Sequence, residues 1–241
     1  MPRFFTEKDN IIESKINITG TDAKHIGRSL RMRLNDIITI CCNGIEYQCE
    51  IITISDTLVE CRIISQQIGE NEPDISLTLF QAMPKSDKLD FIVQKAVELG
   101  AAEICPVLTS RCVSRPDKKA FAKKLDRLNK IALEAAKQSG RNIVPKVSGI
   151  ISFAECIERL QGMEYPLICY EKGGKNLSQV GLKSNSDVGV LIGSEGGFSS
   201  EEAEQAFSSG IIPIGLGNRI LRCETAPISA ISIIMNLTGN M

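Results

Sequence analysis

The sequence lacks several features that would assign it to particular protein classes. It has no tryptophan, a single histidine (His25), and nine cysteines that form no Cys-x-x-Cys pair. A zinc site or a Cys-His nucleophile pair is therefore not expected, and we predict no metal ion. No run of about 18 apolar residues occurs, so no membrane-spanning helix is expected.

Nothing in the composition departs from that of an ordinary globular protein. Hydrophobic residues make up 43% and charged residues 24% of 241 residues, enough chain to bury a substantial core. The opening residues 1–5 are not followed by the apolar segment of a secretory signal. Nine cysteines without such a signal fit a reducing compartment, so we expect a cytoplasmic protein.

The basic residues are clustered although the net charge is −1. Residues 111–141 contain ten Lys or Arg and three acidic residues, and a second cluster, Lys24, Arg28, Arg31 and Arg33, surrounds His25. Basic clusters on a near-neutral chain are typical of phosphate contacts. Solvated helix faces carry similar runs, so composition alone leaves both interpretations open.

The chain is expected to divide into two domains. Apolar, β-branched runs at 37–40, 47–54 and 58–64 predict strands, and Asn43-Gly44 predicts a tight hairpin turn. With a short helix at 21–25, residues 1–67 suggest a small, mostly β domain, a barrel. Residues 66–74 are polar, contain Gly and Pro, and predict a linker.

After the linker, strands alternate with helices. Strands are expected at 75–82, 103–108, 167–170, 188–192 and 211–216, and helices after Ser86 (ending at Gly100), from 121 to 140, near 152–160 and over 226–237. Ser199 and Glu202 form a capping box, and Ser86 and Thr225 are predicted helix caps. This alternation predicts a mainly parallel sheet with helices on both faces.

Two glycine-containing loops are the strongest candidates for a ligand site, because ligands bind at the carboxyl ends of parallel strands. The first is Ile192-Gly193-Ser194-Glu195-Gly196-Gly197-Phe198. Its glycines permit a sharp turn and close approach of a flat ligand, although a plain strand-to-helix turn needs glycine too.

The second loop is Gly215-Leu216-Gly217-Asn218-Arg219-Ile220-Leu221-Arg222-Cys223-Glu224-Thr225. Ile220 occupies the third glycine position of a dinucleotide fingerprint, which argues against a nicotinamide-dependent oxidoreductase, and no P-loop motif occurs. Arg219, Arg222 and Glu224 are either chemically active or a surface ion-pair cluster.

Taken together, these two loops resemble the signature of the ribosomal RNA small subunit methyltransferase E family, the 16S rRNA uracil-1498 N3-methyltransferases of the SPOUT superfamily. The resemblance extends over the whole chain, through 1–5, 25–36, 85–90, 95–100 and 134–141. It departs from the family pattern at three positions: Ser194 stands where proline is usual, Cys223 where threonine is usual, and Asn218 where other residues are common. Without proline, the backbone at Ser194 is less constrained.

The resemblance implies a fold that the residue pattern alone does not. It implies a PUA-like RNA-binding β-barrel at 1–70 and, at 74–241, a SPOUT-type α/β methyltransferase domain with a deep trefoil knot, which forms a homodimer. Topology rules alone would have excluded a knot. The apolar final helix also fits burial against a second copy, although packing in its own core would explain it equally.

The family pattern also predicts the residues of the site. We expect S-adenosyl-L-methionine to be bound by Tyr170, Gly193, Ser194, Glu195, Gly196, Leu216, Gly217, Ile220, Leu221 and Thr225. We expect 16S rRNA of the small ribosomal subunit to be contacted by Arg3, Lys24, His25, Arg28, Arg31, Arg33, Arg111, Arg115 and Arg141.

The expected reaction is methyl transfer from S-adenosylmethionine to N3 of a uridine in 16S rRNA. Arg222 is the candidate that stabilises the developing uracil anion, and Glu224 is the candidate that accepts the proton or orients Arg222. His25 lies in the predicted RNA-binding domain and is a poor base candidate. The alternatives are a SPOUT methyltransferase acting on another RNA such as tRNA, and a non-catalytic RNA-binding ribosome assembly factor.

Overall fold

The computed structural model, which describes residues 1–241, divides into two units. The first comprises residues 1–72 and 136–144, and the second comprises residues 73–135 and 145–241. The expected boundary between residues 70 and 74 is close to the first division. The second division, which assigns 136–144 to the N-terminal unit, has no counterpart in the sequence-based boundaries.

The N-terminal unit is built on one six-stranded sheet. Its strands are β1 (Arg3–Phe5), β2 (Ile11–Ile12), β3 (Lys15–Thr19), β4 (Ile37–Cys42), β5 (Ile45–Ile54) and β6 (Leu58–Ile68), in the order β1-β4-β5-β6-β3-β2. All pairs are antiparallel except β1 with β4. Asn43 and Gly44 have φ of 48° and 82°, as the predicted turn between β4 and β5 requires.

Alternate residues of these strands point to one side and form a core around Phe4, Ile16, Ile38 and Ile51. The short helix α1 (Gly20–Lys24) continues into one π-helical turn, η2 (His25–Ser29), and contributes Ala23 and Ile26 to the same core. The exposed face of this helical segment carries Lys24, His25 and Arg28. A short 3₁₀ turn, η1 (Lys8–Asn10), connects β1 and β2.

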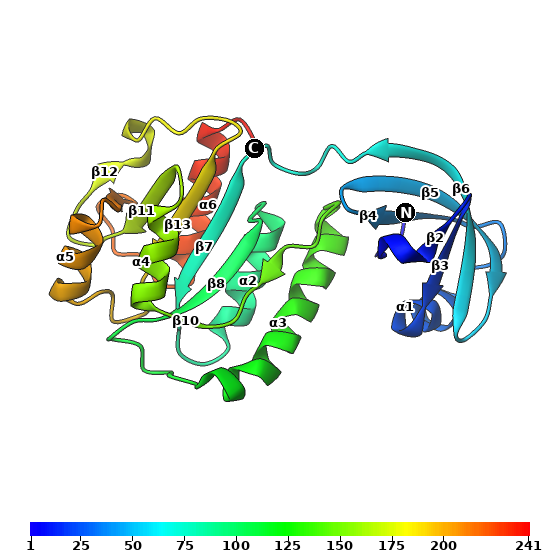
Figure 1. Ribbon diagram of the computed structural model, residues 1–241, viewed down its shortest axis with the longest axis horizontal. Helices are drawn as coiled ribbons and strands as arrows, with labels where there is room; N and C mark the ends of the chain where they lie inside the picture. The colour runs from blue at the N-terminus through cyan, green and yellow to red at the C-terminus, as the bar shows by residue number, and fades with distance from the viewer. The chain divides into compact units, whose positions relative to one another are not determined.

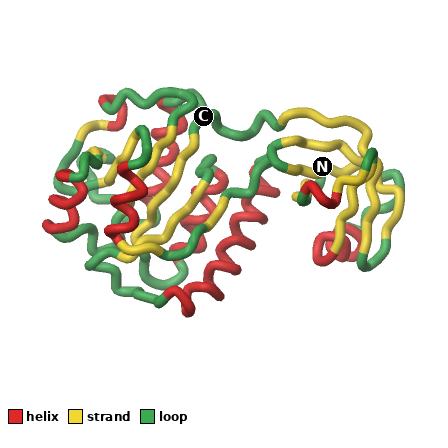
Figure 2. The backbone as a smooth tube through the Cα atoms, in the orientation of Figure 1, coloured by secondary structure: helices red, strands yellow, loops and turns green.

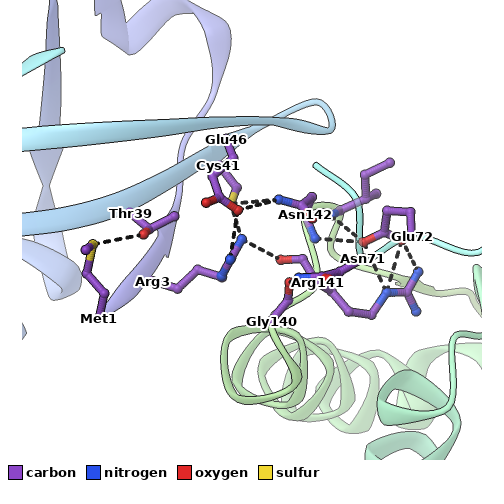
Figure 3. A network of polar contacts seen from close by, with 11 residues as sticks. Met1, Arg3, Thr39, Cys41, Glu46, Asn71, Glu72, Gly140, Arg141 and Asn142 are labelled. Atoms are coloured by element: carbon purple, nitrogen blue, oxygen red, sulfur yellow. Dashed lines mark hydrogen bonds and ion pairs between the residues drawn. The ribbon is translucent and has the colours of Figure 1, made fainter. Parts of the chain in front are cut away.

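A polar network explains why residues 136–144 belong to the N-terminal unit (Figure 3). Glu72 accepts from the backbone N–H of Asn142 at 2.7 Å and from the Arg141 guanidinium. Asn142 Nδ2 donates to Glu46 at 3.1 Å, and Glu46 is ion-paired with Arg3 at 2.9 Å. The Arg141 side chain is 5% exposed, so this network is interior.

The C-terminal unit contains a parallel sheet with the order β10-β8-β7-β13-β11-β14-β12 (Figure 1). Its strands are β7 (Ser76–Ala82), β8 (Glu103–Leu108), β9 (Lys146–Val147), β10 (Ile151–Ser152), β11 (Tyr165–Cys169), β12 (Lys175–Asn176), β13 (Asp187–Ile192) and β14 (Ile212–Gly215). β9 also pairs with β8. The pairing is parallel throughout, as the alternation of strands and helices predicts.

The position of β14 in this sheet is unusual. It pairs with β11 on one side and with β12 on the other, although both strands precede it and belong to the segment that leads to β13. The last strand of the sheet is therefore inserted between two strands that precede it in the chain. This insertion agrees with the knotted fold that the resemblance implies.

Helices cover both faces of the parallel sheet (Figures 1 and 2). The helices are α2 (Lys88–Glu98), α3 (Lys118–Ser139), α4 (Phe153–Gln161), α5 (Ser200–Ser208) and α6 (Thr225–Leu237), with a 3₁₀ turn η3 (Leu177–Gln179). α4 and α5 pack with Phe80, Ile168 and Leu191 on one face. α2 and α6 pack against each other, and α6 also contacts β13.

Two predicted helix caps are wrong. The residue before α2 is Asp87, and Ser86 has φ of 56°, because the chain makes a turn between β7 and α2 before the helix begins. α6 has Glu224 as its N-cap, and Thr225 is its first helical residue. The predicted capping box of Ser199 and Glu202 is confirmed.

Candidate functional site

Three loops at the carboxyl ends of β11, β13 and β14 line a cavity of about 580 Å³. Neighbouring parallel strands end at the same edge of a sheet, so their following loops converge there. The lining residues are Lys88, 169–171, Gly173, 192–198, 214–223 and Ala226. A cavity of this size is within the usual range for small-molecule and cofactor sites.

The loop after β13 is a close-packed turn. The Gly197 N–H donates to the Ser194 carbonyl at 3.0 Å, and Gly197 has φ of 63°, which favours glycine. A Cβ added at Gly193 would lie 3.2 Å from Gly197 Cα. The loop can therefore present its backbone closely to a ligand. The Ser194 hydroxyl is buried and has no partner within the chain, so it is available to one.

The other end of this loop is anchored through α5. Glu202, with a residue exposure of 8%, accepts from Ser110 Oγ at 2.9 Å and from the Ser199 N–H at 3.0 Å. Arg111 Nη1 donates to the Gly196 carbonyl at 3.0 Å. The loop after β8 therefore supports the first glycine loop from outside the cavity.

The loop after β14 has no comparable side-chain contacts to the rest of the chain. No side chain from Leu216 to Arg222 makes a hydrogen bond or ion pair within the chain, and Ile220 is 86% exposed. Gly217 has φ of 100°, a conformation that other residues rarely adopt. Arg222 lines the cavity, is exposed, and has no carboxylate partner. Its guanidinium remains free to bind a ligand.

Three charged lining residues, Lys88, Glu171 and Arg219, were not among the predicted site residues, and of these Lys88 is the one with ion-pair partners. Its Nζ lies 2.9 Å from Glu195 Oε1 and 3.0 Å from Glu224 Oε2. These two hydrogen bonds raise the pKa of Lys88, and the bond from Lys88 is the main reason that the pKa of Glu224 is lowered. The available signal was its position in the segment 85–90, which resembles the family pattern but was not assigned a role.

Cys223 is part of the same cluster. Its thiol lies 3.2 Å from Glu224 Oε2 and 3.6 Å from Lys88 Nζ. Burial, together with the neighbouring carboxylates, raises the pKa of Cys223 to about 12. The group is therefore a neutral thiol and not a nucleophile at neutral pH.

The structure brings together most of the residues predicted for cofactor binding. Nine of them line the cavity: Tyr170, Gly193, Ser194, Glu195, Gly196, Leu216, Gly217, Ile220 and Leu221. Thr225, the first residue of α6, does not line the cavity, whereas the next residue, Ala226, does. Of the two predicted catalytic residues, Arg222 lines the cavity and Glu224 lies beside it, bound to Lys88.

The predicted RNA contacts fall into three groups. Lys24, His25, Arg28, Arg31 and Arg33 are exposed on the N-terminal unit, where Arg28 pairs with Asp56. Arg111 and Arg115 are exposed on the C-terminal unit and donate to the carbonyls of Gly196 and Thr109. Arg3 and Arg141 are different, because both are tied to carboxylates inside the network of Figure 3. Their side chains support the fold and are not presented to phosphates.

The structure shows neither a metal centre nor a membrane-spanning helix. No group of three or more His, Cys, Asp or Glu side chains is placed to hold a metal ion. No helix combines the length and apolar character needed to cross a bilayer.

Both units match models of known families. Residues 70–235 match the RNA methyltransferase domain, and residues 18–64 match the RNA methyltransferase PUA domain. The ribosomal RNA small subunit methyltransferase E of Bacillus subtilis is 37% identical over 97% of this chain and 96% of its own length. The protein belongs to the ribosomal RNA small subunit methyltransferase E family. The family and the two-domain fold class predicted from the sequence are thereby confirmed.

Two solved relatives with a bound cofactor share the whole fold of this chain. The Neisseria gonorrhoeae member of this methyltransferase E family, crystallised with S-adenosylmethionine, superposes with a TM-score of 0.87 at 32% identity over 99% of this chain and 98% of its own. A Legionella pneumophila methyltransferase with the same bound cofactor gives a TM-score of 0.89 at 29% identity over 98% and 97% of the two chains. The whole fold, including the sheet with β14 between β11 and β12, is therefore that of cofactor-binding methyltransferases.

Proposed function

We propose that this methyltransferase transfers a methyl group from S-adenosylmethionine to N3 of uracil-1498 in 16S rRNA of the small ribosomal subunit. The observation that carries the proposal is the glycine-lined cavity at the carboxyl ends of β11, β13 and β14, with the unpaired Arg222 on its wall. The family supplies the reaction class, and this site supplies the groups that the reaction needs.

The residues of the cavity fit S-adenosylmethionine. Ile192, Phe198, Ile214, Leu216 and Leu221 offer apolar walls for a purine ring. The backbone groups of the two glycine loops and the unpartnered Ser194 hydroxyl offer hydrogen bonds to its polar edge and ribose. When bound, the cofactor supplies a methyl group made electrophilic by the adjoining sulfonium.

Arg222 acts on the nucleobase in this proposal. Uracil N3 carries a weakly acidic proton, and only the deprotonated nitrogen has a free in-plane lone pair for attack on the methyl carbon. A guanidinium that donates to a uracil carbonyl stabilises the anion as it forms, as oxyanion donors do. The N3 proton passes to water, and the N3–methyl bond forms as the sulfur–methyl bond breaks.

Glu224 is a poor base in this arrangement. Hydrogen bonding from Lys88 lowers the pKa of its carboxyl group, and that group lies beside the cavity and not on its wall. A carboxylate with a lowered proton affinity gives little assistance to the removal of a weakly acidic proton. We therefore assign Glu224 to holding Lys88 and leave the proton to solvent.

The N-terminal unit supplies RNA affinity in this proposal. Its PUA-domain match and the exposed cluster Lys24, His25, Arg28, Arg31 and Arg33 support phosphate contacts there. Exposed lysines of α3, among them Lys119, Lys123 and Lys130, extend the basic surface of the C-terminal unit. With a ribosomal substrate, the proposed location of the enzyme is the cytoplasm.

We also propose a homodimer. One face of α6 is buried within the unit, whereas Ile233 and Leu237 remain 38% and 37% exposed. The helix α2, which packs against α6, carries Phe91, which is 45% exposed. An apolar strip on a terminal helix is stabilised when a second copy covers it. Light scattering at micromolar concentration should give twice the chain mass of 26.3 kDa. A concentration-independent monomer would contradict the dimer.

The decisive experiment is to locate the methyl group. Small ribosomal subunits lacking the modification should be incubated with the enzyme and S-adenosylmethionine, and the 16S rRNA digested and mapped by mass spectrometry. The expected product is N3-methyluridine at position 1498. Methyl incorporation into tRNA instead would support the alternative SPOUT substrate, and RNA binding without incorporation would support a non-catalytic assembly factor.

A further inference from the structure

Lys88 is the point at which three segments of the C-terminal unit meet. It is the first residue of α2, in the connection that follows β7. Glu195 comes from the loop after β13, and Cys223 and Glu224 come from the loop after β14. An ammonium group has three N–H donors, and these two carboxylates and the Cys223 sulfur are three acceptors for them.

The first of these contacts is reinforced by the backbone. The Lys85 N–H lies 3.2 Å and 3.3 Å from the two carboxylate oxygens of Glu195. Glu195 is thus held from two positions of the same short connection, at the N-terminal end of α2, where a negative charge is favoured by the helix dipole. The first glycine loop is therefore fixed to the β7–α2 connection.

The second contact has no such reinforcement. No side chain from Leu216 to Arg222 is bonded within the chain, so the loop after β14 is tied to its surroundings at its far end, by Cys223 and Glu224. Lys88 supplies the positive charge there. Removing it would leave Glu195 and Glu224 close together without a cation between them.

The burial of the cluster makes these contacts stronger than ordinary surface ion pairs. The side chains of Lys88, Glu195 and Glu224 are 30%, 26% and 22% exposed. Partly buried charges are screened less by water and salt than exposed ones. Partial burial opposes ionisation of Glu195, but the bonds from Lys88 and from the Lys85 N–H outweigh it and lower its pKa. All three groups are therefore charged at neutral pH.

We propose that Lys88 is a positioning residue for methyl transfer, which holds the two glycine loops at the separation that the cofactor requires and thereby places Arg222 over the reacting nucleobase. The inference rests on the proposed function of the cavity. It assigns to Lys88 a role through Glu195 and Glu224 and not a direct part in the chemistry.

The test compares Lys88→Met with Lys88→Arg and with a control on the same helix, Lys95→Met. Lys95 pairs with Glu98 within α2 and lies outside the cavity lining. Lys88→Met should weaken S-adenosylmethionine binding, measured by calorimetry, by about tenfold or more, and lower kcat further because Arg222 is misplaced. Lys88→Arg should recover most of both losses, and Lys95→Met should change neither.

A second variant separates loop positioning from a general loss of stability. In the Lys88→Met background, Glu224→Gln should restore part of the cofactor affinity, because it removes the repulsion between the two carboxylates. A purely structural defect would become worse with the second substitution. If Lys88→Met alone fails to fold, the positioning role can still be tested by measuring the cofactor affinity of Lys88→Arg and of the double variant.

The outcomes are distinguishable from failure of the proposed function. If the wild-type protein methylates uridine and Lys88→Met binds cofactor and turns over normally, the positioning role is refuted while the function stands. An additive or worse effect of Glu224→Gln in the Lys88→Met background would also refute it. If the wild-type protein binds no S-adenosylmethionine, the proposed function itself fails.

Discussion

Among single residues, Arg222 differs from Lys88 and Glu195 in having no partner, a property that it shares on this loop with Arg219. Lys88 binds two carboxylates, and Glu195 accepts from Lys88 and from the Lys85 N–H. Arg222 is exposed on the cavity wall within a loop whose side chains make no internal bonds. An unpaired cation next to a cofactor site is a group available to the substrate.

This placement predicts a specific kinetic result for Arg222→Ala. Turnover should fall by about 10²-fold, the usual loss when one donor to a developing anion is removed. Cofactor affinity should change little, because the guanidinium acts on the nucleobase. Calorimetry and single-turnover kinetics measure the two effects separately. Parallel loss of cofactor binding and turnover would assign Arg222 to the cofactor pocket and not to the chemistry.

Glu224 leads to a prediction about pH. Hydrogen bonding from Lys88 lowers the pKa of Glu224 from its ordinary value of 4.5, so the carboxylate is ionised throughout the neutral range. The increase of rate with pH between about 6 and 9, which reflects loss of the uracil N3 proton, should therefore persist in Glu224→Gln. If that increase flattened in the variant, Glu224 would be the base.

The same shift affects stability in acid. Because the folded-state pKa of Glu224 lies below its unfolded value, its ion pair stabilises the protein fully above pH 4.5 and is lost as pH falls through the lower folded value. In Glu224→Gln, the unfolding temperature should therefore fall less steeply as the pH drops below about 4.5. In the neutral range, the unfolding temperature of the variant should not change with pH through this group.

At the scale of elements, the insertion of β14 between β11 and β12 depends on close backbone contact. Gly174 precedes β12, and a Cβ added there would lie 2.7 Å from the backbone N and C atoms of Ile214. Backbone atoms in the middle of a sheet cannot move aside as a side chain can. This glycine is therefore needed to let β12 pair with β14.

Gly174→Ala should consequently disrupt the β12–β14 pair. Overpacking of this kind costs about 1–3 kcal/mol, which for a protein of this size lowers the unfolding temperature by roughly 2–12 °C. Cofactor affinity should fall as well, because Gly173 and Ile214 line the cavity. Gly149→Ala is the control, since a Cβ there meets nothing within 4 Å. Equal unfolding temperatures for the two variants would show that the sheet tolerates the contact.

For the whole molecule, RNA affinity is expected to come from charges that are not already neutralised within the chain. Arg31 and Arg33 are exposed on the N-terminal unit, and neither makes an ion pair. Lys15 and Arg62 are also on this unit but pair with Glu60 and Glu50. The two sets therefore provide a matched comparison.

If about six phosphates are bound, the logarithm of RNA affinity should fall with the logarithm of salt concentration with a slope near −4. Replacing Arg31 and Arg33 with Ala should reduce the slope by about one to two units without changing cofactor binding. Lys15→Ala with Arg62→Ala should leave the slope nearly unchanged. Identical slopes for the wild-type protein and the Arg31/Arg33 variant would mean that this cluster is only a solvated surface.

Local sequence patterns were sufficient for most elements and for much of the cavity. Three kinds of prediction depend only on neighbouring residues: the strands predicted from apolar runs, the Asn43-Gly44 turn and the capping box at Ser199. The structure confirms all three. Two glycine loops that follow parallel strands must meet at one edge of a sheet, so nine predicted cofactor residues lie together. The predicted caps at Ser86 and Thr225 were wrong because the tertiary path, and not local capping preference, determines where α2 and α6 begin.

Other properties depend on contacts between residues far apart in the chain. The sequence marks Arg141 as one more residue of a basic segment, but the fold buries it against Glu72. It places Lys88 over 100 residues from both of its carboxylate partners, and no periodicity links them. The insertion of β14 between β11 and β12 likewise arises from the path of the whole chain. Side-chain patterns specify elements and their buried faces, whereas the partner of each charge depends on which distant segments the folded chain brings within a few ångströms.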